Sequence, residues 1–148
     1  IVRECDIDAG MLDFEITELM LQSDALNNYS ICSALQKLGA RLTIDDYGTG
    51  ACSLGHLARS HVDAVKVDNS FVEHCADSAS DRAAIGAIVA MAQVLGVSVI
   101  AEGVESAEQS AVLTELGCHL QQGYLYCKPG SADDIEHMFR SAREPRRS

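Results

Sequence analysis

The stretch from residue 64 to residue 101 contains a strand, a helix and a second strand in succession. Its ends read Ala64-Val65-Lys66-Val67-Asp68 and Val97-Ser98-Val99-Ile100-Ala101, two short apolar runs rich in β-branched residues. Between them, the segment 81–95 carries apolar residues at spacings of three and four, and Gly96 follows as a helix-terminating residue. Such a unit predicts two parallel strands joined by a right-handed crossover.

The same alternation extends in both directions along the chain. We predict further strands at 12–16, 41–45 and 118–124, and further helices at 25–38, 53–59, 106–116 and 131–141. Ser106 with Gln109 three residues later is a capping-box pattern that marks the start of one of these helices. Five strands, each followed by a helix, predict an α/β fold built on a parallel sheet.

Composition narrows the class of protein. The 148 residues are 47% hydrophobic and 22% charged, which excludes intrinsic disorder. Lys and Arg number 11 against 22 Asp and Glu, a net charge of −11, so we expect no nucleic-acid polymer as partner. No apolar run reaches the length of a membrane span and no signal peptide opens the chain. We expect a cytoplasmic chain, although a longer parent protein could be tethered to a membrane.

The six cysteines include no C-x-x-C pair, so the sequence predicts reduced thiols rather than a zinc site or a disulfide framework.

Polar side chains occur at or just after the end of every predicted strand. They are Glu15 with Glu18, Asp45 with Asp46, Lys66 with Asp68, Glu102 with Glu105, and Gln122. The carboxyl ends of parallel strands meet at one edge of a sheet, which is where ligands bind in α/β folds. We therefore expect these side chains to converge on one site.

The charges of this set indicate divalent cations. At an effective dielectric constant of 20, two carboxylates about 5 Å apart repel each other by ~3 kcal/mol. Lys66 supplies one positive charge, and the remaining excess favours Mg²⁺ or Mn²⁺, which prefer hard oxygen ligands. Adjacent Asp45 and Asp46 can serve two ions, and paired ions suit in-line displacement at phosphorus.

The sequence also leaves open purely structural roles for the same residues. An Asp-Asp pair before a glycine loop can form a turn or a helix cap, and Glu18 can be a solvated acid of a first helical turn. Lys66 is harder to explain in this way, because it lies between two valines, where burying an unpaired ammonium group is costly.

Five motifs follow one another along the chain. In order, they are Phe14-Glu15-Ile16-Thr17-Glu18, Ile44-Asp45-Asp46-Tyr47-Gly48-Thr49-Gly50, Val65-Lys66-Val67-Asp68-Asn69-Ser70-Phe71-Val72, Ala101-Glu102-Gly103-Val104-Glu105 and Gln122-Gly123-Tyr124-Leu125-Tyr126. Together they resemble the EAL-domain family, the phosphodiesterases of the bacterial messenger cyclic di-GMP. The resemblance extends from about Leu12 to Phe139. It implies a modified (β/α)8 barrel of the TIM type, hydrolysis of cyclic di-GMP to linear pGpG, and two Mg²⁺ or Mn²⁺ ions.

The resemblance also implies roles for single residues. Glu15, Asp45, Asp46 and Glu102 would be metal ligands. Lys66, Glu102 and Asp46 would be catalytic, with Lys66 orienting the attacking water or a phosphate oxygen. Asp68, Glu105 and Gln122 would lie on the substrate side. Glu18 would position the loop after Asp46, a region that would also form a homodimer.

Two elements of the family pattern are absent from these 148 residues. The Glu-Ala-Leu strand and the strand with an Asn ligand do not occur, and Ala51-Cys52 replaces a more usual aromatic-Ser pair. A (β/α)8 barrel needs about 250 residues. We therefore expect a partial barrel of about five βα units that lacks the first strands, with residues 1–142 as the C-terminal part of an EAL domain and 143–148 as a charged tail.

This interpretation predicts that the parent domain hydrolyses cyclic di-GMP and that these 148 residues alone are inactive. The alternative is a degenerate EAL module that binds cyclic di-GMP or a protein partner without catalysis.

Overall fold

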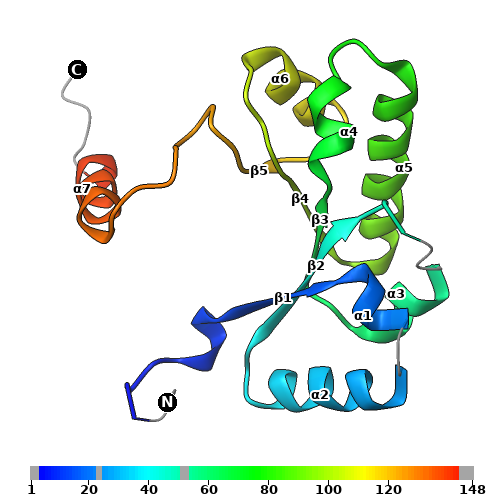
Figure 1. The fold of residues 1–148 in the computed structure, drawn as a ribbon, viewed down its shortest axis with the longest axis vertical. Helices are drawn as coiled ribbons and strands as arrows, with labels where there is room; N and C mark the ends of the chain where they lie inside the picture. Colours follow the sequence, from blue (N-terminus) through cyan, green and yellow to red (C-terminus); the bar gives the residue numbers. More distant parts are fainter. Residues whose placement is uncertain (1–3, 23–24, 51–53, 144–148) are drawn as a thin grey trace.

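A single parallel sheet organises the protein (Figure 1). The computed structural model describes residues 4–22, 25–50 and 54–143. The strands follow one another in the sheet in chain order. They are β1 (Asp13–Thr17), β2 (Arg41–Tyr47), β3 (Ala64–Val67), β4 (Ser98–Ala101) and β5 (Leu120–Gln121). All four pairings are parallel, which confirms the predicted series of βα units.

Helices connect the strands. They are α1 (Glu18–Gln22), α2 (Ala25–Lys37), α3 (Leu54–Ser60), α4 (Asn69–His74), α5 (Ala79–Leu95), α6 (Ala107–Glu115) and α7 (Ala132–Arg143), and a 3-10 turn, Ala9–Met11, precedes β1. Figure 1 shows α4, α5 and α6 gathered beside the β3–β5 end of the sheet, whereas α7 lies apart from the sheet. Among the described helices, none is long and apolar enough to cross a membrane.

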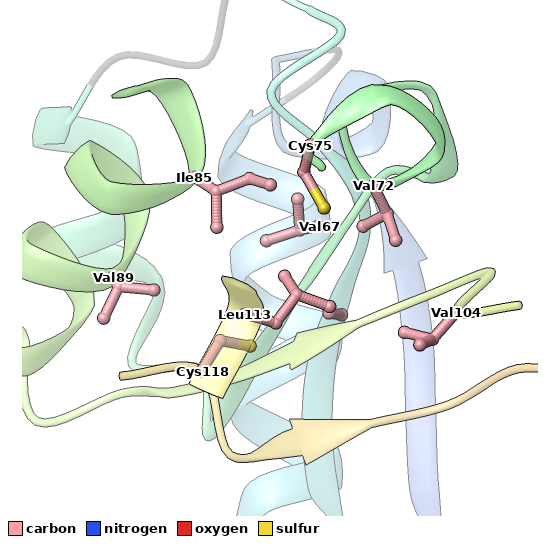
Figure 2. Packing of buried hydrophobic residues seen from close by; sticks show 9 residues of the cluster. Val67, Val72, Cys75, Ile85, Val89, Val104, Leu113 and Cys118 are labelled. Carbon is pink, nitrogen blue, oxygen red and sulfur yellow. The ribbon is translucent and has the colours of Figure 1, made fainter. Parts of the chain in front are cut away.

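Buried aliphatic side chains hold the layers together in two clusters. The first, shown in Figure 2, packs Val67 and Ala101 of the sheet against Ile85 and Val89 of α5 and Leu113 of α6. The second packs β2 and β3 against α2 and α3. All four residues of β3 are buried, so the strand that carries Lys66 lies in the packed interior.

Several predicted boundaries are confirmed by the helix caps. Gly96 ends α5 in the left-handed conformation, with φ of 70°. Ser106 and Gln109 form the predicted capping box at the start of α6. The helix predicted from Asp81 begins earlier, at Ala79, because Ser78 caps it.

Other predictions were wrong in extent. The last strand covers Leu120–Gln121 rather than 118–124, because the backbone turns at Gly123, whose carbonyl accepts from the amides of Tyr126 and Cys127. Helices α1 and α4 were not predicted. Helix α7 ends at Arg143, two residues beyond the predicted end at residue 141. Ser53, Ala51 and Cys52 lie outside the described residues.

The five described cysteines are all free thiols: Cys5, Cys32, Cys75, Cys118 and Cys127.

Candidate metal centre around Lys66

Three carboxylates from three different segments surround the Lys66 ammonium group. Its Nζ lies 2.6 Å from Glu102 Oε1, 2.8 Å from Glu15 Oε1 and 3.3 Å from Asp45 Oδ1. Glu15 belongs to β1, Asp45 to β2 and Lys66 to β3, while Glu102 follows β4 directly. The parallel pairing of adjacent strands therefore brings these four residues together at the sheet.

The Lys66 side chain is only 7% exposed, so the three carboxylates, rather than water, stabilise its positive charge. Burial alone lowers the pKa of an ammonium group. Here hydrogen bonds to Glu102 and Glu15, together with the charge of Glu102, outweigh burial and raise the pKa of Lys66 above its ordinary value. Lys66 is consequently a permanent cation at any physiological pH.

Asp45, Asp46 and Glu102 form a group of oxygen ligands that can hold a metal ion. One carboxylate oxygen from each lies within 4.8 Å of the others. Asp45 Oδ1 is buried and has no hydrogen-bond partner among the described residues, and its ion pair with Lys66 Nζ spans 3.3 Å. A buried oxygen without a donor, within a set of carboxylates, fits a hard divalent cation such as Mg²⁺ or Mn²⁺.

An irregularity in β2 explains how two consecutive aspartates reach the same site. Side chains of consecutive residues in a regular strand point to opposite faces of the sheet. The pairing of β2 with β3 shifts register between Ile44 and Tyr47, and Asp46 adopts the left-handed conformation with φ of 54°. This local break allows the carboxylates of Asp45 and Asp46 to lie on the same side.

The carboxyl groups repel one another electrostatically. The charge of Asp45 is the main cause that raises the pKa of Asp46, and the nearby Asp68 raises it further. Burial raises the pKa of Glu102, and Lys66 offsets this only in part. A divalent cation would relieve this excess of negative charge.

Glu15 lies slightly apart from the ligand group. It contacts Lys66, but its carboxylate is not among those within 4.8 Å of one another in the described part of the chain, and its side chain is half exposed. The structure thus brings three of the four predicted metal ligands into one group and connects the fourth through Lys66.

Glu18 fixes the glycine loop after β2. The side chain is buried at the start of α1, and its Oε2 accepts from the amides of Gly48 and Gly50, each at 3.2 Å. A Cβ atom at residue 50 would lie 2.8 Å from Glu18 Oε1, so a larger residue there would displace the Glu18 carboxylate. Glu18 is therefore a buried acceptor rather than a solvated acid.

The remaining predicted residues are Asp68, Glu105 and Gln122, of which Asp68 lies near Asp46. Asp68 is the N-cap of α4 and accepts from the amide of Ser70 at 3.0 Å. Glu105 and Gln122 are exposed, on the loop after β4 and at the end of β5. The sequence also gave no sign that Gln109, beyond its capping role, donates to the Glu73 carbonyl and joins α6 to α4.

Comparison with known proteins identifies the class to which this fold and site belong. The EAL domain family model matches residues 1–129, and the chain belongs to the EAL-domain family. It is 39% identical over 142 residues to the cyclic di-GMP phosphodiesterase NbdA of Pseudomonas aeruginosa, and 38% identical over 141 residues to the cyclic di-GMP phosphodiesterase PdeR of Escherichia coli. These alignments cover 96% and 95% of this chain but 18% and 21% of the relatives.

Solved structures of EAL proteins share the fold of this chain. The EAL domain of Mycobacterium smegmatis DcpA superposes with a TM-score of 0.88 at 31% identity, over 97% of this chain and 65% of that one. The Klebsiella pneumoniae BlrP1 manganese and cyclic di-GMP complex has a TM-score of 0.79 at 31% identity, over 84% of this chain and 32% of that one. The predicted fold class, parallel βα units of a TIM-type barrel, is thereby confirmed.

Proposed function

We propose that this chain forms the lysine and acid centre of a phosphodiesterase that hydrolyses cyclic di-GMP to linear pGpG. The observation that carries the proposal is the convergence of Asp45, Asp46 and Glu102 beside Lys66. The names of the relatives, and the cyclic di-GMP and manganese bound in the Klebsiella complex, support the choice of substrate and of cation.

Asp45, Asp46 and Glu102 would hold Mg²⁺ or Mn²⁺, and Glu15 would contribute to a second ion. Bound there, such ions supply positive charge that polarises the phosphate and makes a water molecule more acidic. The fit rests on the oxygen donor set and on the buried, unbonded Oδ1 of Asp45.

Lys66 would act by charge and by hydrogen bonding. Because its pKa is raised, it stays protonated and cannot serve as a general base. Its ammonium group can instead hold a phosphate oxygen or orient the attacking water, and it stabilises negative charge that develops at phosphorus.

Glu102 is the proposed proton acceptor, because its carboxylate lies in the acid group and 2.6 Å from Lys66, which would orient the attacking water. In the reaction, a water oxygen would bond to phosphorus as one ring P–O bond breaks. Glu102 would accept the proton of the water and return it to the leaving ribose oxygen, which departs as a hydroxyl group.

We propose that Asp68, Glu105 and Gln122 lie on the substrate side of the site. Glu18 would keep the loop 48–50 in place, and we propose that a homodimer forms through the region after Asp46. We also propose that the protein works in the cytoplasm, where a bacterial messenger would reach it.

A second candidate function, binding without hydrolysis, is favoured by one observation. Lys66 already neutralises part of the acid cluster, and Glu15 lies outside the ligand group. We therefore propose that these 148 residues alone turn over cyclic di-GMP slowly or not at all, and that efficient hydrolysis belongs to the parent domain.

Incubation with cyclic di-GMP and Mn²⁺, followed by chromatographic separation of the nucleotides, tests the proposal. We expect binding of cyclic di-GMP, with slow pGpG formation that disappears in Asp45→Asn but not in Asp133→Asn, a matched change on the exposed α7. Binding with no pGpG would favour the binding module, and absence of both would refute the proposed function.

A further inference from the structure

A network of polar side chains, which we call the α6 network, fastens the end of β5 and the turn after it to helix α6. Tyr126 Oη donates to Gln121 Oε1, and Ser110 Oγ lies 3.0 Å from Tyr126 Oη. Because Tyr126 gives its proton to Gln121, Ser110 is the donor in the second bond. Gln121 Nε2 donates in turn to Thr114 Oγ1 at 3.2 Å and to the carbonyl of Cys118 at 3.0 Å.

The turn 123–127 depends on this network because its side chains are poorly buried. Tyr124, Leu125 and Tyr126 are 57%, 38% and 53% exposed. Hydrophobic packing scales with the apolar area removed from water, so it holds such a segment weakly. The hydrogen bonds of Tyr126 and Gln121 are therefore a main side-chain anchor of the turn.

The opposite side of the turn is bonded to the loop that follows β4. The amide of Gln122 donates to Ala101 O at 2.8 Å, and the amides of Val104 and Leu125 donate to Gln122 O and Val104 O, each at 3.0 Å. A Cβ atom at residue 123 would lie 2.1 Å from Val104 O, so the two backbones are in direct contact there. The turn is consequently coupled to the loop at Val104, whereas the Glu102 amide donates to Val67 O of β3 at 3.4 Å.

We propose that Gln121 and Tyr126 are positioning residues for the nucleotide. By fixing the turn to α6, they would hold Gln122, whose amide is bonded to Ala101 O, next to the loop that carries Glu102 and Glu105. This inference rests on the proposed function. Glu102, in the same loop, is held independently by Lys66 at 2.6 Å. Loss of the α6 network should therefore weaken binding of the nucleotide and leave binding of the cation unchanged.

Tyr126→Phe removes the hydroxyl at the centre of the network, and Tyr124→Phe is the matched control two residues away. Calorimetry with cyclic di-GMP in Ca²⁺, a cation present in a Klebsiella complex with that nucleotide, measures the nucleotide affinity. Tyr126→Phe should weaken it about fivefold, the loss of roughly one ordinary hydrogen bond. The affinity for Mn²⁺ alone should not change, and Tyr124→Phe should match the unsubstituted protein.

Hydrogen exchange of the amides of Val104, Gln122 and Leu125 is the second readout. Tyr126→Phe should accelerate their exchange roughly tenfold, because the turn then opens more often, while amides of β3 keep their rates. If Tyr126→Phe does not fold, Thr114→Val removes another acceptor of the network, and Thr114→Ser should restore the affinity.

The possible outcomes test the positioning role and the proposed function separately. Equal nucleotide affinities in Tyr126→Phe and the unsubstituted protein would overturn the positioning role, as would an equal loss of Mn²⁺ affinity or unchanged exchange. Failure of the proposed function appears elsewhere, as absence of cyclic di-GMP binding in the unsubstituted protein itself.

Discussion

Replacing Lys66 by Met removes the positive charge from the acid cluster and keeps most of the side-chain volume. Removing one partner of a buried ion pair costs about 3–5 kcal/mol, because a charge is left without compensation. Glu15 is half exposed and contributes less, whereas the side chains of Asp45 and Glu102 are 26% and 20% exposed. We therefore expect Lys66→Met to lose ~3 kcal/mol of unfolding free energy in the absence of metal.

The expected loss applies across the neutral pH range. The pKa of Lys66 is raised in the folded protein, so its stabilising effect is fully present below the pKa of an unfolded lysine and disappears only as pH rises through the folded value. At pH 7.5 the full effect is measured. For a chain of this length, ~3 kcal/mol corresponds to roughly 10 °C in Tm.

Thermal melts in EDTA and in Mn²⁺ provide the assay, with Lys37→Met on the exposed surface of α2 as the matched control. A bound cation replaces the missing charge, so Mn²⁺ should raise the Tm of Lys66→Met more than that of the unsubstituted protein. An unchanged Tm of Lys66→Met in EDTA, or the same Mn²⁺ increment in both proteins, would refute the electrostatic reasoning.

Three further predictions follow from the same contacts. Glu18→Ala leaves two glycine amides without their acceptor and should cost about 1–3 kcal/mol of unfolding free energy in denaturant melts. An unchanged denaturation midpoint would show that the loop 48–50 does not depend on Glu18. Since the pKa of Glu102 is raised, the folded protein binds a proton more readily than the unfolded chain, and the metal-free protein should gain stability as pH falls from neutral toward the ordinary carboxyl pKa. Glu102→Gln should reduce this dependence of stability on pH. Equal pH dependence in the variant and the unsubstituted protein would show that Glu102 is not the group that titrates. Gly123→Ala should destabilise the protein by about 1–3 kcal/mol, because its Cβ would meet Val104 O. Gly86→Ala inside α5, where the nearest atom is 3.6 Å away, should instead stabilise the protein by about 0.5–1 kcal/mol. Equal melting curves for the two variants would contradict this contrast.

The alternation of strands and helices could be predicted from the sequence because its signals are local. A run such as Ala64–Val67, flanked by polar residues, favours a buried strand whatever its neighbours are. The caps at Gly96 and Ser106 depend on residues within one helical turn. These features need no knowledge of the tertiary structure.

The extent of the last strand could not be predicted in the same way. Apolar and polar residues alternate from Cys118 to Gln121, but Gly123 lies against the backbone of Val104, a residue distant in sequence. The pairing between β4 and β5 is therefore limited to two residue pairs, Ile100 with Leu120 and Ala101 with Gln121. Contacts of this kind override local preference.

The sequence predicted which residues form the site but not how their side chains are arranged. The motifs placed Asp45, Lys66 and Glu102 at strand ends, and the structure brings them together. That Asp46 joins them depends on its left-handed backbone conformation and on the register shift in β2. Regular alternation would have placed Asp46 on the face opposite Asp45.

Calorimetric titration with Mn²⁺ tests most directly whether the acid cluster is a metal centre. The account predicts that the unsubstituted protein binds Mn²⁺ and that Asp45→Asn weakens this binding at least about tenfold, through loss of a central ligand, whereas Asp133→Asn binds as before. Equal Mn²⁺ affinities in Asp45→Asn and the unsubstituted protein, or absence of binding in all three, would contradict it.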